Sequence, residues 1–211
     1  MSFSKQSWAS EMDADTLFKR LRSHYMEAFR AELEEMVREK GSDAVIVEPI
    51  LEASPPDPDD MPIDDPVWAP TPPSFSRLDL AVANPNGQWF PHRVAPDDML
   101  AFDPGEFELE GGLAVELESF AWDDAFVTVE PANAATTQAA LDWFVREANE
   151  KKLPGPRPLN LVHALEPIGG GGFVIDLGTA HASALSRLLE AVEKAGAKTV
   201  KIGTLGDGPA L

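Results

Sequence analysis

Cysteine is absent from the 211 residues of this chain. Without thiols, neither disulfide bonds nor thiolate–metal sites can hold the fold together, and catalysis by a cysteine nucleophile is excluded. A chain without disulfides suits a reducing compartment, so we expect a cytoplasmic protein.

Long apolar stretches are also missing. Nowhere do about 18 apolar residues run uninterrupted, which is the length that a membrane-spanning helix needs. The residues from Met1 to Trp8 lack the apolar core of a secretory signal. We therefore expect a protein that neither spans a membrane nor is exported by a signal peptide.

Basic residues are scarce in the middle of the chain. Residues 41–145 hold 21 acidic residues against Arg77 and Arg93, a balance of −19, while the rest of the chain holds 15 acids and 15 bases. Charge of that sign repels phosphate backbones and anionic membranes and speeds encounter with a basic partner. We expect a basic protein partner, with no nucleic acid and no membrane. The alternative is that the charge only keeps the protein soluble.

A long amphipathic helix is predicted over residues 12–40. Apolar residues recur there at four-residue spacing, at Leu17, Leu21, Tyr25, Phe29, Leu33 and Val37. Ser10 and Asp13 resemble a capping box, and Lys40–Gly41 is typical of a helix end. A short apolar strand is predicted over residues 44–50.

Proline and acidic residues dominate the next segment, residues 51–76. Nine prolines fall between Pro49 and Pro73, which excludes a helix or a central strand. We interpret the segment as a loop or linker between residues 1–50 and an α+β sheet domain over 77–211, with residues 1–50 and 77–211 forming one compact domain. As a binding arm it would present Asp57, Asp59, Asp60, Asp64, Asp65 and Trp68; the alternative is an inert connection.

Two β-hairpins are predicted next. The first joins residues 77–83 and 88–94, and Pro91 confines its second strand to an edge or bulge. The second joins residues 106–110 and 113–119, whose alternation places Glu106, Glu108, Glu110, Glu116 and Glu118 on one face. Like charges on adjacent strands destabilise each other, so this face is either fully solvated or awaits a cation.

The last third of the chain predicts a β-α-β-β-α-β order. The predicted strands are 125–130, 159–165, 173–177 and 199–204, and the predicted helices are 137–152 and 182–195. This order over about residues 125–205 is that of a four-stranded ferredoxin-like unit, so the fold class is α+β. The residues expected to be buried are Leu141, Phe144, Val145, Phe173, Ile175, Leu185, Leu188, Leu189, Val192, Val200 and Ile202.

Val174-Ile-Asp-Leu-Gly-Thr179 resembles the first phosphate motif of the actin and heat-shock ATPase family. In that family the motif lies in a hairpin near the start of a much larger protein, whereas here a helix is predicted to follow it. A second interpretation is a strand end, a bend at Gly178, and a helix capped by Thr179 or Ser183.

No catalytic, cofactor-binding or metal-binding residue is predicted. His24, His92, His163 and His181 lack the spacing of metal ligands, so we interpret them as surface or packing residues. Trp122, Asp123 and Asp124 form a candidate partner site, since aromatic anchors beside charges are typical of binding hot spots. Asp123–Asp124 or Asp97–Asp98 could alternatively serve a carboxylate-based enzyme.

In its size, acidity, lack of a catalytic constellation and irregular α+β order, the chain resembles the immunity proteins that neutralise bacterial toxins. That resemblance implies a non-enzymatic module whose acidic surface docks onto a basic toxin. The alternatives are a carboxylate-based hydrolase or small-molecule-binding protein, and an adaptor or chaperone for a secreted protein.

Overall fold

The described part of the chain has a mixed α+β fold. The structure is a computed structural model and describes residues 4–7, 13–52, 75–96, 98–168 and 170–204. The helices are α1 (Ala14–Lys40), a 3₁₀ turn η1 (Ser42–Ala44), α2 (Ala134–Ala148) and α3 (Ser183–Lys194). The strands are β1 (Ser4–Ser7), β2 (Val45–Val47), β3 (Ile50–Glu52), β4 (Phe75–Arg77), β5 (Leu80–Ala83), β6 (Trp89–His92), β7 (Gly105–Glu108), β8 (Ala114–Leu117), β9 (Ala125–Glu130), β10 (Ala164–Pro167), β11 (Gly172–Asp176) and β12 (Thr199–Gly203).

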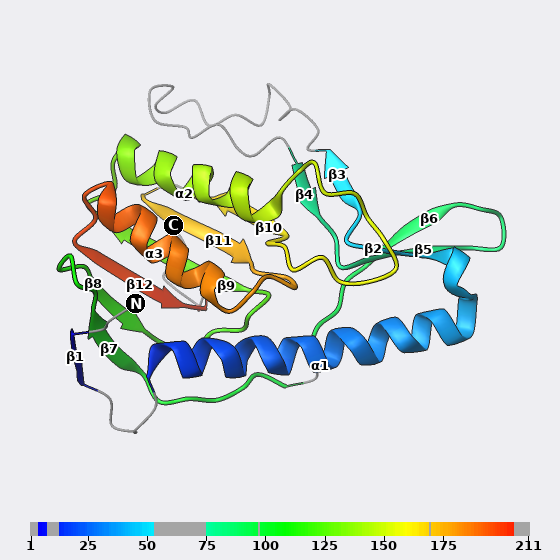
Figure 1. Ribbon diagram of the computed structural model, residues 1–211, viewed down its shortest axis with the longest axis horizontal. Coiled ribbons are helices and arrows are strands. Elements are labelled where there is room, and N and C mark those ends of the chain that lie inside the picture. The colour runs from blue at the N-terminus through cyan, green and yellow to red at the C-terminus, as the bar shows by residue number, and fades with distance from the viewer. Residues whose placement is uncertain (1–3, 8–12, 53–74, 97, 169, 205–211) are drawn as a thin grey trace.

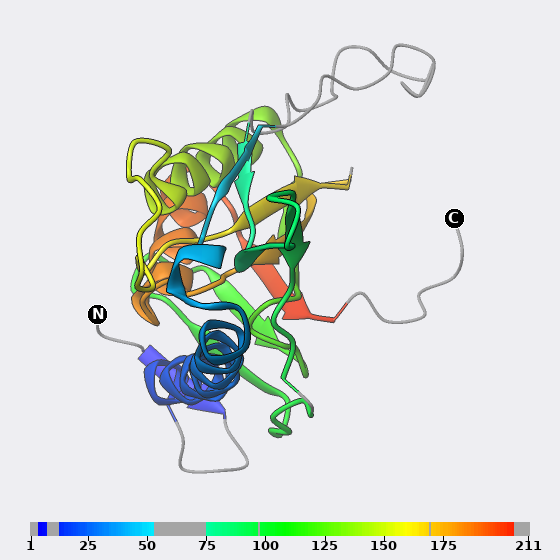
Figure 2. The ribbon, with the colours of Figure 1, turned by 90° about the vertical axis from the view of Figure 1, so that its right-hand side faces the viewer.

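The largest sheet has the strand order β1-β7-β8-β12-β9-β11-β10. Every neighbouring pair is antiparallel except β8 and β12, which are parallel. Helices α2 and α3 both lie on one side of this sheet, and the longer α1 runs beside them (Figures 1 and 2). The four antiparallel strands predicted within residues 125–205 are confirmed as β12-β9-β11-β10, and the predicted second hairpin, β7–β8, joins β12 and extends this sheet.

Both predicted hairpins are confirmed. Strands β5 and β6 pair antiparallel around the turn at residues 84–87, and β7 and β8 pair antiparallel around the turn at residues 110–112. The strand that contains Pro91, β6, lies at the edge of the small sheet β2-β5-β6, as proline in that strand requires. A third sheet consists of β3 and β4.

The predicted N-terminal helix is confirmed as α1. Its N-cap is Asp13, whose carboxylate accepts a hydrogen bond from the Thr16 amide at 2.7 Å, so the capping role predicted for Ser10 is wrong. The buried apolar side chains of α1 include Leu17, Phe18, Leu21, Tyr25, Met26 and Phe29, but Val37 near the C-terminal end is exposed. Leu33 and Met36 are partly buried against the same core, so burial decreases toward the C-terminal end of the helix.

The predictions for Val145 in α2 and for the start of β10 are wrong. Val145 is 53% exposed, because α2 turns Ala140, Trp143 and Phe144 toward the core instead. The Trp143 indole fixes this rotation by donating a hydrogen bond to the Ala184 carbonyl at 2.9 Å. The strand predicted over residues 159–165 begins only at Ala164, after a non-helical, non-strand segment.

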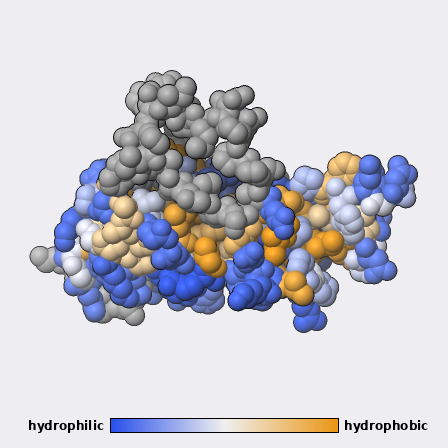
Figure 3. All heavy atoms as spheres, turned by 90° about the horizontal axis from the view of Figure 1, so that it is seen from above, coloured by the Kyte–Doolittle hydropathy of each residue, from blue (hydrophilic) through white to orange (hydrophobic). Residues whose placement is uncertain are grey.

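Buried apolar side chains from Ala14 to Ile202 form one connected core. Phe173 and Ile175 of β11 belong to it, as predicted, and face the helices. Seen from above, over α2, the outer surface carries hydrophobic side chains between hydrophilic ones (Figure 3). No helix within the described residues combines the length and apolar character needed to cross a membrane.

Candidate functional site

Four of the predicted acidic site residues lie on the side of the large sheet that faces away from α2 and α3. In β7 and β8, Phe107, Val115 and Leu117 are buried, while the alternating Glu106 and Glu108 are exposed and Glu116 is half-exposed. Glu118 follows β8 and is also exposed. We call Glu106, Glu108, Glu116 and Glu118 the open acidic face.

A base from another strand reaches this face. Register aligns Glu106 with Glu116 and Glu116 with Lys201 of β12. The Lys201 ammonium lies 2.7 Å from the Glu116 carboxylate, and this pairing raises the pKa of Lys201. Alternation in β9 places the exposed Glu130 on the same side of the sheet. The two alternatives given for this face, full solvation or an awaited cation, therefore do not hold for Glu116, which is paired with a lysine of the same chain.

The other predicted site residues divide between the core, a cavity and the part of the chain that is not described. Asp57, Asp59, Asp60, Asp64, Asp65 and Trp68 lie outside the described residues. Trp122 is buried, and its indole donates a hydrogen bond to the Gly178 carbonyl at 2.9 Å. Asp123 is nearly buried and Asp124 is exposed. Trp122 is thus a core residue, and its buried side chain cannot contact a partner at the surface.

Asp123 and Asp124 line a cavity of about 360 Å³ between α1 and two loops. Its polar side chains are His24, Tyr25, Arg93, Asp98, Asp123 and Asp124. Burial raises the pKa of Asp123, although the Arg93 guanidinium lies 3.8 Å away and acts in the opposite direction. The charged side chains of the cavity are therefore three carboxylates and one guanidinium, in a lining that is otherwise mostly apolar.

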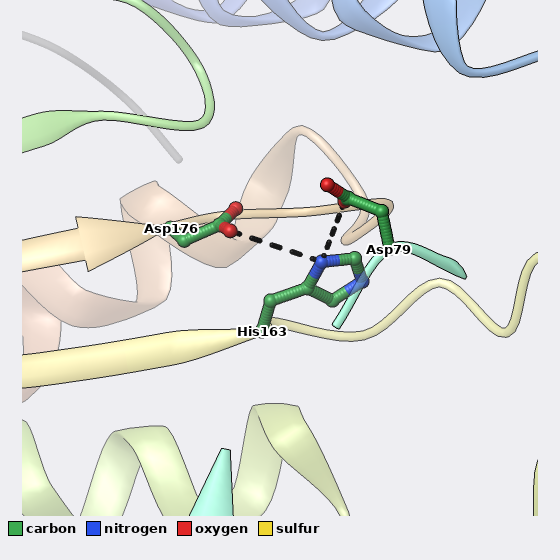
Figure 4. A group of neighbouring side chains, drawn as sticks. All are labelled: Asp79, His163 and Asp176. Carbon is green, nitrogen blue, oxygen red and sulfur yellow. Dashed lines mark ion pairs between the residues drawn. The ribbon is translucent and has the colours of Figure 1, made fainter. Parts of the chain in front are cut away.

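Next to this cavity lies a cluster of buried ionisable side chains around His163. His163 is fully buried just before β10, and its two ring nitrogens face three carboxylates. Nε2 lies 2.8 Å from Glu48 Oε1, and Nδ1 lies 3.1 Å from Asp79 Oδ1 and 3.9 Å from Asp176 Oδ2. Figure 4 shows Asp79 and Asp176 on the same side of the imidazole, both directed toward Nδ1.

The carboxylates are held in place by further hydrogen bonds. Asp79 accepts from the Tyr25 hydroxyl and, at 2.8 Å, from the Val94 amide. Asp176 Oδ1 accepts from the Gly178 amide at 2.8 Å. Since each oxygen so engaged is fixed, the cluster is preorganised before any ligand arrives.

Glu48 occupies the far side of the imidazole. It is fully buried in a left-handed backbone conformation, with φ of 51°, and accepts hydrogen bonds from the Thr179 hydroxyl and the Leu159 amide. Arg77 supports this turn, because its guanidinium donates to the Glu48 carbonyl at 2.9 Å and to three carbonyls at and just after the end of α2. The position of Glu48 is therefore determined by three separate segments.

The charges in the cluster shift one another's pKa values. For His163, burial acts downward, but the carboxylates of Asp79, Glu48 and Asp176 outweigh it and raise its pKa to about 10. For Asp79, burial acts upward, but His163, Tyr25 and Val94 lower its pKa. Burial raises the pKa of Asp176 to about 7. Burial, together with the charge of Asp79, also raises the pKa of Tyr25.

The segment from Val174 to Thr179 supplies three parts of this cluster. Asp176 faces Nδ1 of His163, Thr179 binds Glu48, and Gly178 packs against the imidazole ring. A Cβ built on Gly178 would lie 2.3 Å from the ring, so no larger residue fits there without movement. The predicted capping of α3 by Thr179 or Ser183 is wrong: the N-cap is Ala182, without a side-chain hydrogen bond.

Sequence reasoning missed this cluster and interpreted His163 as an ordinary surface or packing histidine. A signal was present, because each of Glu48, Asp79, His163 and Asp176 stands among apolar residues in or beside a predicted strand. Isolated ionisable residues in such runs are seldom buried unless they are paired. The sequence could not show that the four meet, since up to 128 residues separate them, from 48 to 176.

Comparisons of this chain with protein-family models, with curated proteins and with solved structures give no match.

Proposed function

We propose that this protein is a binding module for a basic protein partner, which docks on the open acidic face. The observation that supports it most is the placement of Glu106, Glu108 and Glu118 as exposed carboxylates on one side of a sheet whose other side is covered by helices. A rigid sheet holds their spacing fixed, which favours recognition of a complementary surface.

An immunity protein that neutralises a basic toxin in the cytoplasm is the form of this proposal that the size and acidity of the chain favour. Catalysis is not part of it. Charge complementarity of this kind acts mainly on the association rate, because the field reaches the partner before contact is made.

A charge-matched pair of variants tests the proposal. The first replaces Glu106, Glu108, Glu116 and Glu118 by Gln, and the second replaces four exposed glutamates of α1, namely Glu27, Glu34, Glu35 and Glu39, by Gln. Both variants lose four negative charges, so a difference between their association rates depends on where the charges lie and not on the net charge.

The partner is enriched from host extract on the immobilised wild-type protein and identified, and its association rate with each protein is then measured by stopped flow. The sheet variant should slow association more than the α1 variant. The wild-type rate should fall as the screening length shortens from about 8 Å at 0.15 M salt to about 3 Å at 1 M. Equal rates for the two variants, or a rate independent of salt, contradict the proposal.

A second candidate function is the binding of a small molecule in the 360 Å³ cavity, which is favoured by the carboxylates of Asp98, Asp123 and Asp124 in its wall. Its size is in the range of small-molecule sites. Small cationic compounds should raise the melting temperature of the wild-type protein and not of Asp123→Asn. Asp103→Asn, which changes an exposed carboxylate outside the cavity, serves as the control.

We also infer that residues 125–203 form a ferredoxin-like unit. The strand order β12-β9-β11-β10 supports this, since β11 lies between β9 and β10, the two strands that α2 connects. The packing of α2 and α3 on one side of these strands supports it as well. An experimental structure of this segment, with the handedness of both crossovers traced, tests the inference.

A further inference from the structure

Three potential metal ligands converge in the buried cluster around His163. Their ligand atoms, His163 Nδ1 and one carboxylate oxygen each from Asp79 and Asp176, all lie within 4.8 Å of one another. They come from a bend before β5, the segment before β10 and the end of β11. Figure 4 shows the three side chains pointing toward a common centre.

The Nδ1 atom of His163 stands out because it is buried without a hydrogen-bond partner. Its 3.1 Å contact with Asp79 Oδ1 has the length of an ion pair but not the geometry of a hydrogen bond. A buried polar atom without a hydrogen-bond partner costs free energy, and a ligand that contacts Nδ1 would remove this cost.

The other ring nitrogen of His163 has the partner that a metal-binding histidine usually has. Nε2 lies 2.8 Å from Glu48 Oε1, and Glu48 is fixed in turn by Thr179 and Leu159. Once an ion replaces the proton on Nδ1, donation of the Nε2 proton to Glu48 keeps the Nδ1 lone pair directed at the ion, and it increases the basicity of that nitrogen.

The spacing of the ligand atoms suits a small divalent ion. Metal–ligand bonds of about 2.1 Å separate tetrahedral ligand atoms by about 3.4 Å. The distances of 3.1 and 3.9 Å from Nδ1 to the two carboxylates fall on either side of that value. An imidazole nitrogen with two carboxylates favours Zn²⁺, Mn²⁺ or Fe²⁺ over Ca²⁺ and Mg²⁺, which prefer oxygen ligands throughout.

We propose that Asp79, His163 and Asp176 bind one divalent first-row transition-metal ion, with Glu48 as the outer-shell partner that orients His163. The ion takes the place of a proton on Nδ1. It would enter from the side of Asp176, whose side chain is 21% exposed, because His163 and Asp79 are enclosed. This site is independent of the proposed protein partner, which docks on the open acidic face.

Titration calorimetry with ZnCl₂ and MnCl₂ on the full chain, after treatment with a chelator, tests the proposal. We expect one ion per chain with at least one of the two metals. Asp176→Asn and His163→Gln should each weaken binding by at least about 100-fold. Glu48→Gln should weaken it by about 10- to 100-fold, as losses of outer-shell partners do.

The matched control is His92→Gln, which removes the imidazole of a half-exposed histidine–carboxylate pair with Glu32 at 2.7 Å. Its affinity for the metal should equal that of the wild type. Asp176→Asn is nearly isosteric and keeps the Gly178 contact within reach, so it retains the test if His163→Gln does not fold. Folding of each variant is checked by near-ultraviolet circular dichroism.

A spectroscopic measurement distinguishes ligation from a purely structural role. In protein labelled with ¹⁵N at histidine, addition of Zn²⁺ should shift the Nδ1 resonance of His163 while Nε2 keeps its proton. If neither metal binds, if both bind as tightly to Asp176→Asn as to the wild type, or if Nδ1 does not shift, the proposal is overturned and His163 is held by the carboxylates alone.

Discussion

Carboxylates occur in two opposite settings in this protein. On the open acidic face, Glu106, Glu108 and Glu118 are exposed to water on one side of the sheet. Around His163, the carboxylates of Glu48 and Asp79 are buried and accept hydrogen bonds from the Thr179 hydroxyl and the Val94 amide, respectively. The first set is available to a partner at almost no cost to folding, whereas the second is coupled to stability because its charges have left water. The same residue type therefore serves association at one place and preorganisation at the other.

The largest expected effect is on the free energy of unfolding, in the buried cluster around His163. Replacing His163 by Gln removes the cation that faces Asp79, Glu48 and Asp176 and leaves their charges uncompensated in the core. We expect the free energy of unfolding, measured by urea titration in chelator, to fall by about 3–5 kcal/mol, as for other broken buried pairs.

The half-exposed pair His92–Glu32 provides the control for this effect. His92→Gln should change the free energy of unfolding by no more than about 1 kcal/mol, because water already screens that pair. A loss for His163→Gln as small as the loss for His92→Gln would show that the buried cluster contributes no more than a surface pair.

The next effect concerns the close packing on His163. Gly178→Ala places a methyl group 2.3 Å from the imidazole ring, and we expect overpacking to cost about 1–3 kcal/mol beyond the backbone strain. Gly170→Ala is the matched control, since its φ of 57° is close to the 49° of Gly178 and its Cβ would meet no atom within 4 Å. Equal melting temperatures for the two variants would contradict the close packing.

The pH dependence of stability tests the charges of the buried cluster around His163. The pKa of His163 is raised from 6.5 to about 10 in the folded protein, so His163 stabilises the fold fully below pH 6.5 and loses that contribution as pH rises through about 10. The denaturation midpoint of the metal-free protein should fall over this range. Asp176, with its pKa raised to about 7, adds a loss in the same direction between pH 3.8 and 7.

The variants separate these two contributions. Between pH 6.5 and 10, the difference in midpoint between the wild type and His163→Gln should shrink as pH rises. Between pH 4 and 7, Asp176→Asn should show a flatter profile than the wild type. A difference between the wild type and His163→Gln that grows with pH would contradict the sign of the His163 shift.

The smallest effect on stability is expected on the open acidic face. Replacing Glu106, Glu108, Glu116 and Glu118 by Gln should change the free energy of unfolding by no more than about 0.5 kcal/mol per residue, as exposed substitutions do. The same variant should have the largest effect on the association rate with the partner. A large loss of stability in urea titration would show that this face contributes to the fold and not only to binding.

Much of the fold could be predicted because local patterns determine it. The four-residue apolar spacing in α1, the alternation in β7 and β8 and the turn residues at 84–87 each specify an element within a few neighbours. The incorrect or missed predictions concern features that depend on residues far apart in the sequence. The rotation of α2 that exposes Val145 depends on a hydrogen bond from Trp143 to Ala184, and the parallel pairing of β8 with β12 joins segments about 85 residues apart.

The candidate site on the sheet could be predicted, and the buried site could not. Alternation alone assigns Glu106 and Glu108 to one face, so their exposure follows from the period of a strand. The ligand set of Asp79, His163 and Asp176 has no fixed spacing, because each residue comes from a different segment and only packing brings them together.

By itself, the sequence determined the types and order of most elements, the segregation of negative charge into residues 41–145 and the outward direction of the glutamates in β7 and β8. These properties depend on backbone preferences and side-chain alternation, which act over a few residues. The tertiary structure alone decided that Glu48, Asp79, His163 and Asp176 meet in the core. Contacts of that kind follow from how α1, the small sheets and the large sheet pack together, and packing is a property of the whole chain.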